Sequence, residues 1–120
     1  LPAPAQGAIA VQIRRNDPAV TRWICRLDHA PTRTETCAER TFLSEMEGGC
    51  QLPLGARAYL NPTGLRLDAV VLNLDGTRRI ADAAVGDDPT ALAHLLSQRM
   101  KRAGADAVLR DVKAAATRPS

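Results

Sequence analysis

Cys50 is the residue of this 120-residue chain whose type and surroundings best suit covalent chemistry. Gly48 and Gly49 precede it, and the sequence Gln-Leu-Pro-Leu-Gly follows it. Glycine has no Cβ, so it allows a sharp backbone bend and the close approach of a bulky ligand. A thiolate on such a segment is a nucleophile suited to covalent tethering. Because free cysteine is also a common buried residue, the spacing alone leaves both roles open and favours the structural one.

Zinc binding is the second chemistry that the residue types allow, because suitable donor atoms are present in Cys25, His29, Cys37 and Cys50. The gaps between them are irregular, and the chain has no Cys-x-x-Cys pair, which zinc sites commonly use. We therefore expect no metal. Cys25 and Cys37 are instead expected to pack within helices.

The composition excludes two classes of function. Lys and Arg give a net charge of +3, but they are interleaved with Asp and Glu along the chain. Nucleic-acid binders gather basic residues in one stripe or add aromatic stacking platforms, and only three aromatic residues are present. No apolar run approaches the roughly 20 residues that cross a bilayer. An odd number of cysteines without a secretory signal indicates free thiols and a cytoplasmic location.

The first half of the chain predicts one strand and two helices. Residues 7–14 are β-branched and partly alternating, which favours a strand. Asp17 followed by Pro18 predicts a helix start, and an amphipathic pattern continues to Leu27. A capping box over residues 32–35 predicts a second helix running to about Glu47. The inward face of this helix is expected to consist of Cys37, Ala38, Phe42 and Met46.

The second half predicts a three-stranded meander followed by two helices. The expected strands cover residues 56–60, 65–74 and 78–85, with turns at 61–64 and at Asp75-Gly76. Asp88-Pro89 predicts a helix to residue 102 or 103, and Gly104 separates it from a last helix over 105–115. The side chains expected to face inward are Leu65, Leu67, Ala69, Val71, Leu92, Leu95, Leu96, Met100, Val108, Leu109 and Val112.

This order of elements predicts an α+β fold, in which a small three-stranded antiparallel sheet has helices on one face. We expect residues 1–16 to be a strand and connection from a preceding domain that is missing here. A lone strand leaves backbone groups unpaired, so this segment is expected to pack poorly or to need a neighbour. Residues 17–116 would form the α+β domain and residues 117–120 a frayed tail.

Residues 39–55, with the sequence ERTFLSEMEGGCQLPLG, resemble the cofactor-attachment segment of porphobilinogen deaminases (hydroxymethylbilane synthases). That family has Glu-Arg, a helical stretch, and then Gly-Gly-Cys-x-aliphatic-Pro-aliphatic-Gly; Leu52 stands where Val or Ile is more usual. Residues 1–8, LPAPAQGA, are similar to the family's LPAPGQGA, with Ala5 in place of a glycine. Residues 27–29 and 104–106 also match, so the resemblance extends from Leu1 to about Val112.

The resemblance implies the C-terminal, cofactor-carrying domain of the transferase that condenses four porphobilinogen units, with loss of ammonia, into the linear tetrapyrrole hydroxymethylbilane, a step of porphyrin and heme biosynthesis. It implies a dipyrromethane cofactor bound by a thioether to Cys50, with Gln6 lining the cofactor pocket. In this family the catalytic Asp and the basic residues that bind substrate carboxylates lie in the N-terminal domains.

We therefore expect no catalytic residue in this chain. By itself the chain is expected to be inactive and to carry no cofactor. Its expected partners are porphobilinogen and the missing N-terminal domains, in a monomeric parent enzyme. The alternative is a stand-alone α+β binding or regulatory module without catalytic activity. A basic cluster and a Lys-Asp pair in the preceding sequence would favour the enzyme.

Overall fold

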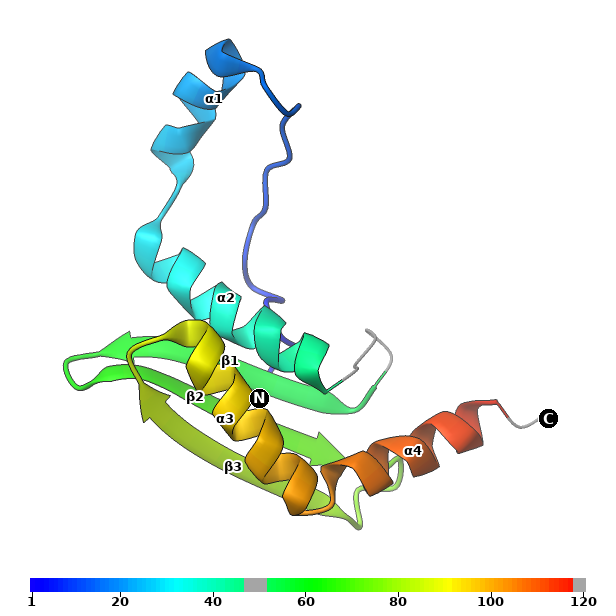
Figure 1. Cartoon of the computed structure of the whole chain (residues 1–120). Helices are drawn as coiled ribbons and strands as arrows, with labels where there is room; N and C mark the ends of the chain where they lie inside the picture. The colour runs from blue at the N-terminus through cyan, green and yellow to red at the C-terminus, as the bar shows by residue number, and fades with distance from the viewer. Residues whose placement is uncertain (47–51, 118–120) are drawn as a thin grey trace.

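The computed structural model describes residues 1–46 and 52–117, and these form an α+β fold (Figure 1). The element order is the predicted one, except that no strand precedes the first helix. The elements are α1 (Pro18–Ile24), the 3-10 helix η1 (Cys25–Leu27), α2 (Ala30–Glu45), β1 (Leu54–Asn61), β2 (Gly64–Leu72), β3 (Arg79–Gly86), α3 (Pro89–Arg102) and α4 (Ala105–Ala116).

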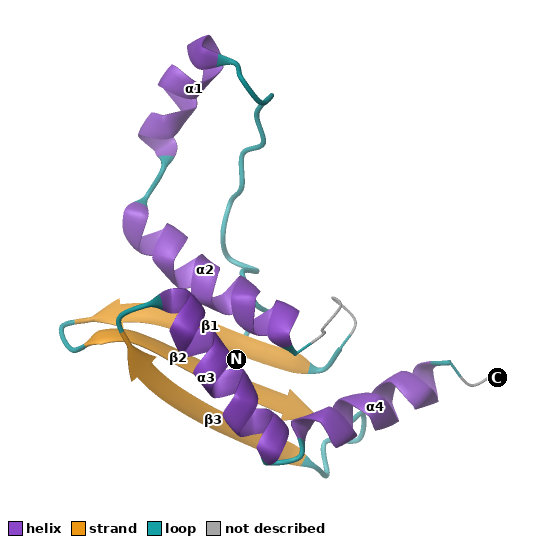
Figure 2. Cartoon of the chain, viewed as in Figure 1, coloured by secondary structure: helices purple, strands orange, loops and turns teal. Residues whose placement is uncertain are grey.

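The three strands form the predicted antiparallel meander, in the order β1-β2-β3. Gly64 closes the β1–β2 turn with a φ of +129°, a conformation that residues with a side chain rarely adopt. Strand β2 alternates strictly, and Leu65, Leu67 and Val71 are almost completely buried, as predicted. Helices α2 and α3 lie across the same face of the sheet (Figure 2), which confirms the predicted layering.

The core lies between this face and the helices. Its large buried side chains are few, and alanines fill the space between them. Because small residues allow close approach of backbones, α2 and α3 can pack near the sheet with Phe42 as the aromatic side chain buried between the layers. The completely or almost completely buried residues include Ala38, Phe42, Met46, Ala56, Leu67, Ala69, Ala93, Leu96, Met100, Ala105 and Val108.

Two of the three predicted side-chain helix caps are confirmed. The Asp17 side chain accepts a hydrogen bond from Val20 N–H at 3.2 Å, and Asp88 accepts one from Ala91 N–H at 2.9 Å. In both cases proline follows in the first turn, where its missing N–H is not needed. An aspartate followed by a proline was therefore sufficient to predict these two helix starts.

The predicted capping box at residues 32–35 is wrong. Helix α2 begins at Ala30, and its cap is His29, whose Nδ1 accepts a hydrogen bond from Thr32 N–H at 3.3 Å. Pro31 lies in the first turn of this helix, a position that tolerates proline. The helix ends at Glu45, and Glu47, its predicted end, lies outside the described residues.

Leu95 on α3 was also predicted wrongly, since it is 49% exposed. Ala93 takes the inward position in its place. Leu95, the larger of these two side chains, lies on the solvent side of α3. The other predicted inward residues of α3 and α4 are buried.

The predicted strand over residues 7–14 is not formed within the described chain. This stretch belongs to what we call the N-terminal arm, residues 6–29, which extends away from the sheet (Figure 1). No residue of the arm is buried, and Ile9 is 95% exposed. Residues 8–14 are exposed or half-buried and pair with no strand of the sheet. Among the described helices, none has the length and apolar character that crossing a membrane requires.

Candidate functional site

Cys50, the predicted attachment residue, lies outside the described residues, as do Gly48 and Gly49. Both flanks of that segment are described, and both are anchored in the core. On one side Met46 is 2% exposed at the end of α2; on the other, Leu52 packs against the core and Leu54 opens β1. The described residues on both sides of Cys50 therefore have side chains packed in the core.

A basic hollow of about 240 Å³ lies beside Met46, the last described residue before this segment. The basic side chains of the hollow come from α3 and α4, so these two helices place positive charge beside the C-terminal end of α2. Such a hollow suits a carboxylate, and Lys101 also complements the C-terminal dipole of α3. The lining residues are Met46, Lys101, Asp106, Leu109, Arg110 and Lys113.

Residues 1–5, which precede the arm, are hydrogen-bonded to the sheet. Ala56 N–H of β1 donates a hydrogen bond of 2.9 Å to the Pro2 carbonyl, so this segment lies against the outer edge of β1. It then turns through residues 3–8, where Gln6 N–H donates to the Ala3 carbonyl at 3.2 Å. Gln6, the second predicted site residue, is exposed, and its Oε1 accepts a hydrogen bond from Ala3 N–H at 3.3 Å.

The contact between residues 1–5 and β1 explains why a glycine, Gly55, ends the attachment motif. A Cβ at this position would lie 2.9 Å from the Leu1 carbonyl oxygen and 3.0 Å from the Leu1 Cβ. A backbone atom cannot be displaced without moving the chain. The glycine is therefore required for residues 1–5 to lie against β1.

Glu39 is the residue that the sequence reasoning missed. Its side chain lies on the sheet-facing side of α2 and is only 9% exposed. Oε2 accepts a hydrogen bond from Ala5 N–H at 2.6 Å, and Oε1 accepts one from Ala58 N–H at 2.8 Å. An acidic residue next to Ala38, among the inward positions of an amphipathic helix, was the available signal, because a buried carboxylate needs partners.

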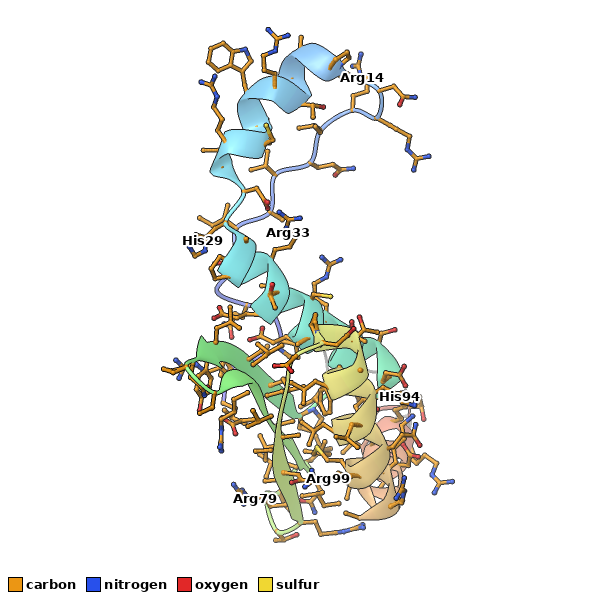
Figure 3. The ribbon with its side chains drawn as sticks, turned by 60° about the vertical axis from the view of Figure 1, so that its left-hand side comes forward. Arg14, His29, Arg33, Arg79, His94 and Arg99 are labelled. Atoms are coloured by element: carbon orange, nitrogen blue, oxygen red, sulfur yellow. The ribbon has the colours of Figure 1, made fainter. Side chains whose placement is uncertain are left out.

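The candidate zinc ligands do not converge in the part of the chain that the structure describes. There, no group of three or more His, Cys, Asp or Glu side chains is placed to hold a metal. His29 caps α2 at the junction of the arm and the body (Figure 3). Cys37 is half-buried on α2, whereas Cys25 is exposed in η1, so the prediction that Cys25 packs inside is wrong.

Two side-chain contacts link α3 to its neighbours. Arg99 donates to Asp82 of β3 at 2.7 Å, and His94 lies 3.5 Å from Glu45 of α2. Figure 3 shows His94 and Arg99 along α3, with Arg79 on the neighbouring strand. These pairs fix the helix from which Lys101 reaches the basic hollow.

The fold and the site together define a small α+β domain whose core packs the residues on either side of the Gly-Gly-Cys motif. The sequence profile of the family described as "Porphobilinogen deaminase, C-terminal domain" matches residues 34–102, more than half of the chain. This chain therefore belongs to the porphobilinogen deaminase family and corresponds to its C-terminal domain.

Three relatives agree with this assignment. The chain is 42% identical to the porphobilinogen deaminase of Desulforudis audaxviator, over 97% of this chain and 38% of the relative. It is 40% identical to that of Moorella thermoacetica, over 95% and 37%, and 38% identical to that of Synechococcus elongatus, over 93% and 36%. The chain thus spans less than two fifths of the length of these relatives.

Proposed function

We propose that this chain is the cofactor-carrying C-terminal domain of a transferase that condenses four porphobilinogen units into hydroxymethylbilane with loss of ammonia. The observation that carries this proposal is the family match over residues 34–102, which includes the Gly-Gly-Cys motif. The membership favours an enzyme domain over a stand-alone regulatory module.

Cys50 is the proposed attachment point of a dipyrromethane cofactor. Its sulfur would bond to the aminomethyl carbon of porphobilinogen as the amino group departs as ammonia, and a thioether of this kind resists hydrolysis. When bound, the cofactor supplies the pyrrole on which the product is built. The flanks of Cys50 fit this role, because both are anchored in the core and would hold the tether in place.

The remaining residues of the chain would bind and orient. A pyrrole with acetate and propionate groups is rich in carboxylates, and the basic hollow beside Met46 suits such a charge. Gln6 would line the cofactor pocket from the turn that follows residues 1–5. We place the catalytic acid and the main substrate-binding cations in the preceding domains, to which residues 6–16 would also pack.

The direct test is Cys50→Ser in the full-length protein, with Cys25→Ser as the matched control because Cys25 is an exposed free thiol. Wild type and Cys25→Ser should carry a dipyrromethane mass increment and form hydroxymethylbilane. Cys50→Ser should lack the increment and lose nearly all activity. Wild-type activity and an adduct in Cys50→Ser would refute the assignment.

The 120-residue chain alone provides a second measurement. Its intact mass should equal that of the unmodified sequence, and it should form no hydroxymethylbilane from porphobilinogen. A dipyrromethane increment on this chain alone would show that the other domains are not needed for attachment.

A further inference from the structure

We propose that Glu39 is a positioning residue, which couples the segment that carries Gln6 to the strand that follows Cys50. This inference rests on the proposed function, since it assigns a purpose to the placement of Gln6 and Cys50. Its physical basis is the pair of hydrogen bonds that the Glu39 carboxylate accepts, one from Ala5 and one from Ala58.

The outer edge of β1 is completed by groups from outside the sheet. Alternate amides of this strand find acceptors outside the sheet: Ala56 donates to the Pro2 carbonyl, Ala58 to Glu39 and Leu60 to Glu35. The edge is thus completed by a piece of backbone and by two carboxylates one helical turn apart on α2. Free edge amides of a strand need such partners.

The two carboxylates differ in how many parts of the chain they join. Glu35 accepts from β1 only, through Oε1 at 3.0 Å, and its bond is exposed. Glu39 is buried, and its second oxygen reaches Ala5, the residue next to Gln6. Glu39 therefore joins three parts of the chain, whereas Glu35 joins only two.

The Glu39 junction fixes residues 1–5 relative to β1. Leu54, the first residue of β1, is four residues after Cys50, so β1 sets the exit point of the attachment segment. The same strand receives residues 1–5 through Gly55, Ala56 and the Glu39 bridge. The position of Gln6 relative to the strand that follows Cys50 is consequently set by contacts to that strand.

The carboxylate is required because both of its partners are N–H donors. In Glu39→Gln the amide retains one acceptor oxygen, and its NH2 group would face the other N–H without an acceptor. One of the two bonds must then break. Glu35→Gln loses no bond, because a single amide oxygen can still accept from Leu60, so it is the matched control.

The experiment compares wild type, Glu39→Gln and Glu35→Gln in the full-length protein by hydrogen–deuterium exchange and by kinetics with porphobilinogen. In Glu39→Gln, we expect exchange in the peptide spanning residues 1–8 to become at least tenfold faster. We also expect kcat to fall at least tenfold, KM to change less than threefold, and the cofactor mass increment to remain. Glu35→Gln should stay within twofold of wild type in each measurement.

Unchanged exchange in residues 1–8, or a kcat for Glu39→Gln within twofold of that for Glu35→Gln, would overturn the inference. If Glu39→Gln does not fold, Gly55→Ala tests the same coupling, because it displaces Leu1 and leaves Glu39 intact. That variant should show the same faster exchange and lower kcat, and wild-type behaviour would again refute the coupling. A wild-type protein without adduct would contradict the proposed function, while the exchange comparison would still decide the role of Glu39.

Discussion

The body of the molecule, residues 30–46 and 52–116, and the N-terminal arm, residues 6–29, follow the same local rules with different outcomes. Both contain an amphipathic helix that starts at an Asp-Pro pair. In the body, α3 buries Leu96 and Met100 completely, whereas in the arm Trp23 is 65% and Leu27 is 69% exposed. Capping and periodicity therefore specify a helix, but burial depends on whether another element lies opposite.

The difference has an energetic consequence. Helix α1 has only seven residues, and isolated helices of that length are marginal in water. With no buried side chain to add stability, α1 should open and close independently of the body. Unfolding of the body should instead be cooperative, because sheet and helices share one core.

The largest expected contrast is between Phe42→Ala and Trp23→Ala in the 120-residue chain. Phe42 is completely buried, so its truncation should lower the free energy of unfolding by about 3–5 kcal/mol. Trp23→Ala removes an exposed ring that stacks only on Arg26, and should change it by less than about 1 kcal/mol. Urea denaturation followed by circular dichroism measures both, and equal losses would show that the arm shares the core.

The two aspartate caps give a contrast of intermediate size. Asp88→Ala should lower the free energy of unfolding by about 1 kcal/mol, because α3 is part of the cooperative body. Asp17→Ala should leave it unchanged within error, because α1 is already open when the body unfolds. Asp88→Asn and Asp17→Asn, which keep a capping oxygen, serve as controls. A matching loss for Asp17→Ala would mean that α1 is coupled to the body.

The smallest expected effect is a pH dependence from the β2–β3 hairpin of the body. The Thr77 hydroxyl and amide both donate to Asp75, and these bonds hold the pKa of its carboxyl below the usual 3.8. A lowered pKa contributes stability above the unfolded value, and this contribution is lost as pH falls below 3.8 through the folded value. In Asp75→Asn, the melting temperature should therefore fall slightly less than in wild type as the pH is lowered from 5 into the acid range. An unchanged pH dependence would contradict this.

Much of the fold was predictable from short-range patterns. The strict alternation of β2, the turn glycines and the Asp-Pro caps each have a local physical cause, and each predicted its element correctly. The start of α2 was wrong because Thr32-Arg33-Thr34-Glu35 and His29 are both acceptable caps. Only the position of Pro31 in the first turn distinguishes them, and proline is compatible with either a helix start or a break.

The site was less predictable, because its contacts are long-range. The bonds from Ala5 and Ala58 to Glu39 span 34 and 19 residues, and no periodicity encodes such distances. The same holds for Gly55, whose neighbour Leu1 is at the far end of the sequence. The attachment motif identified Cys50 by resemblance, and its assignment as the tether remains a prediction.

The completed edge of β1 also bears on how the protein behaves at high concentration. Leu54, Ala56, Ala58 and Leu60 all donate to acceptors within the chain, so β1 has no row of amides with which to recruit a strand from another molecule. Of the two outer strands of this sheet, β3 is the one left for intermolecular strand addition, and it carries charged residues at Arg79 and Asp82. Loosening residues 1–5 would free the Ala56 amide on this edge, and breaking the bridge at Glu39 would free the Ala58 amide, which together would begin a second edge open to another strand.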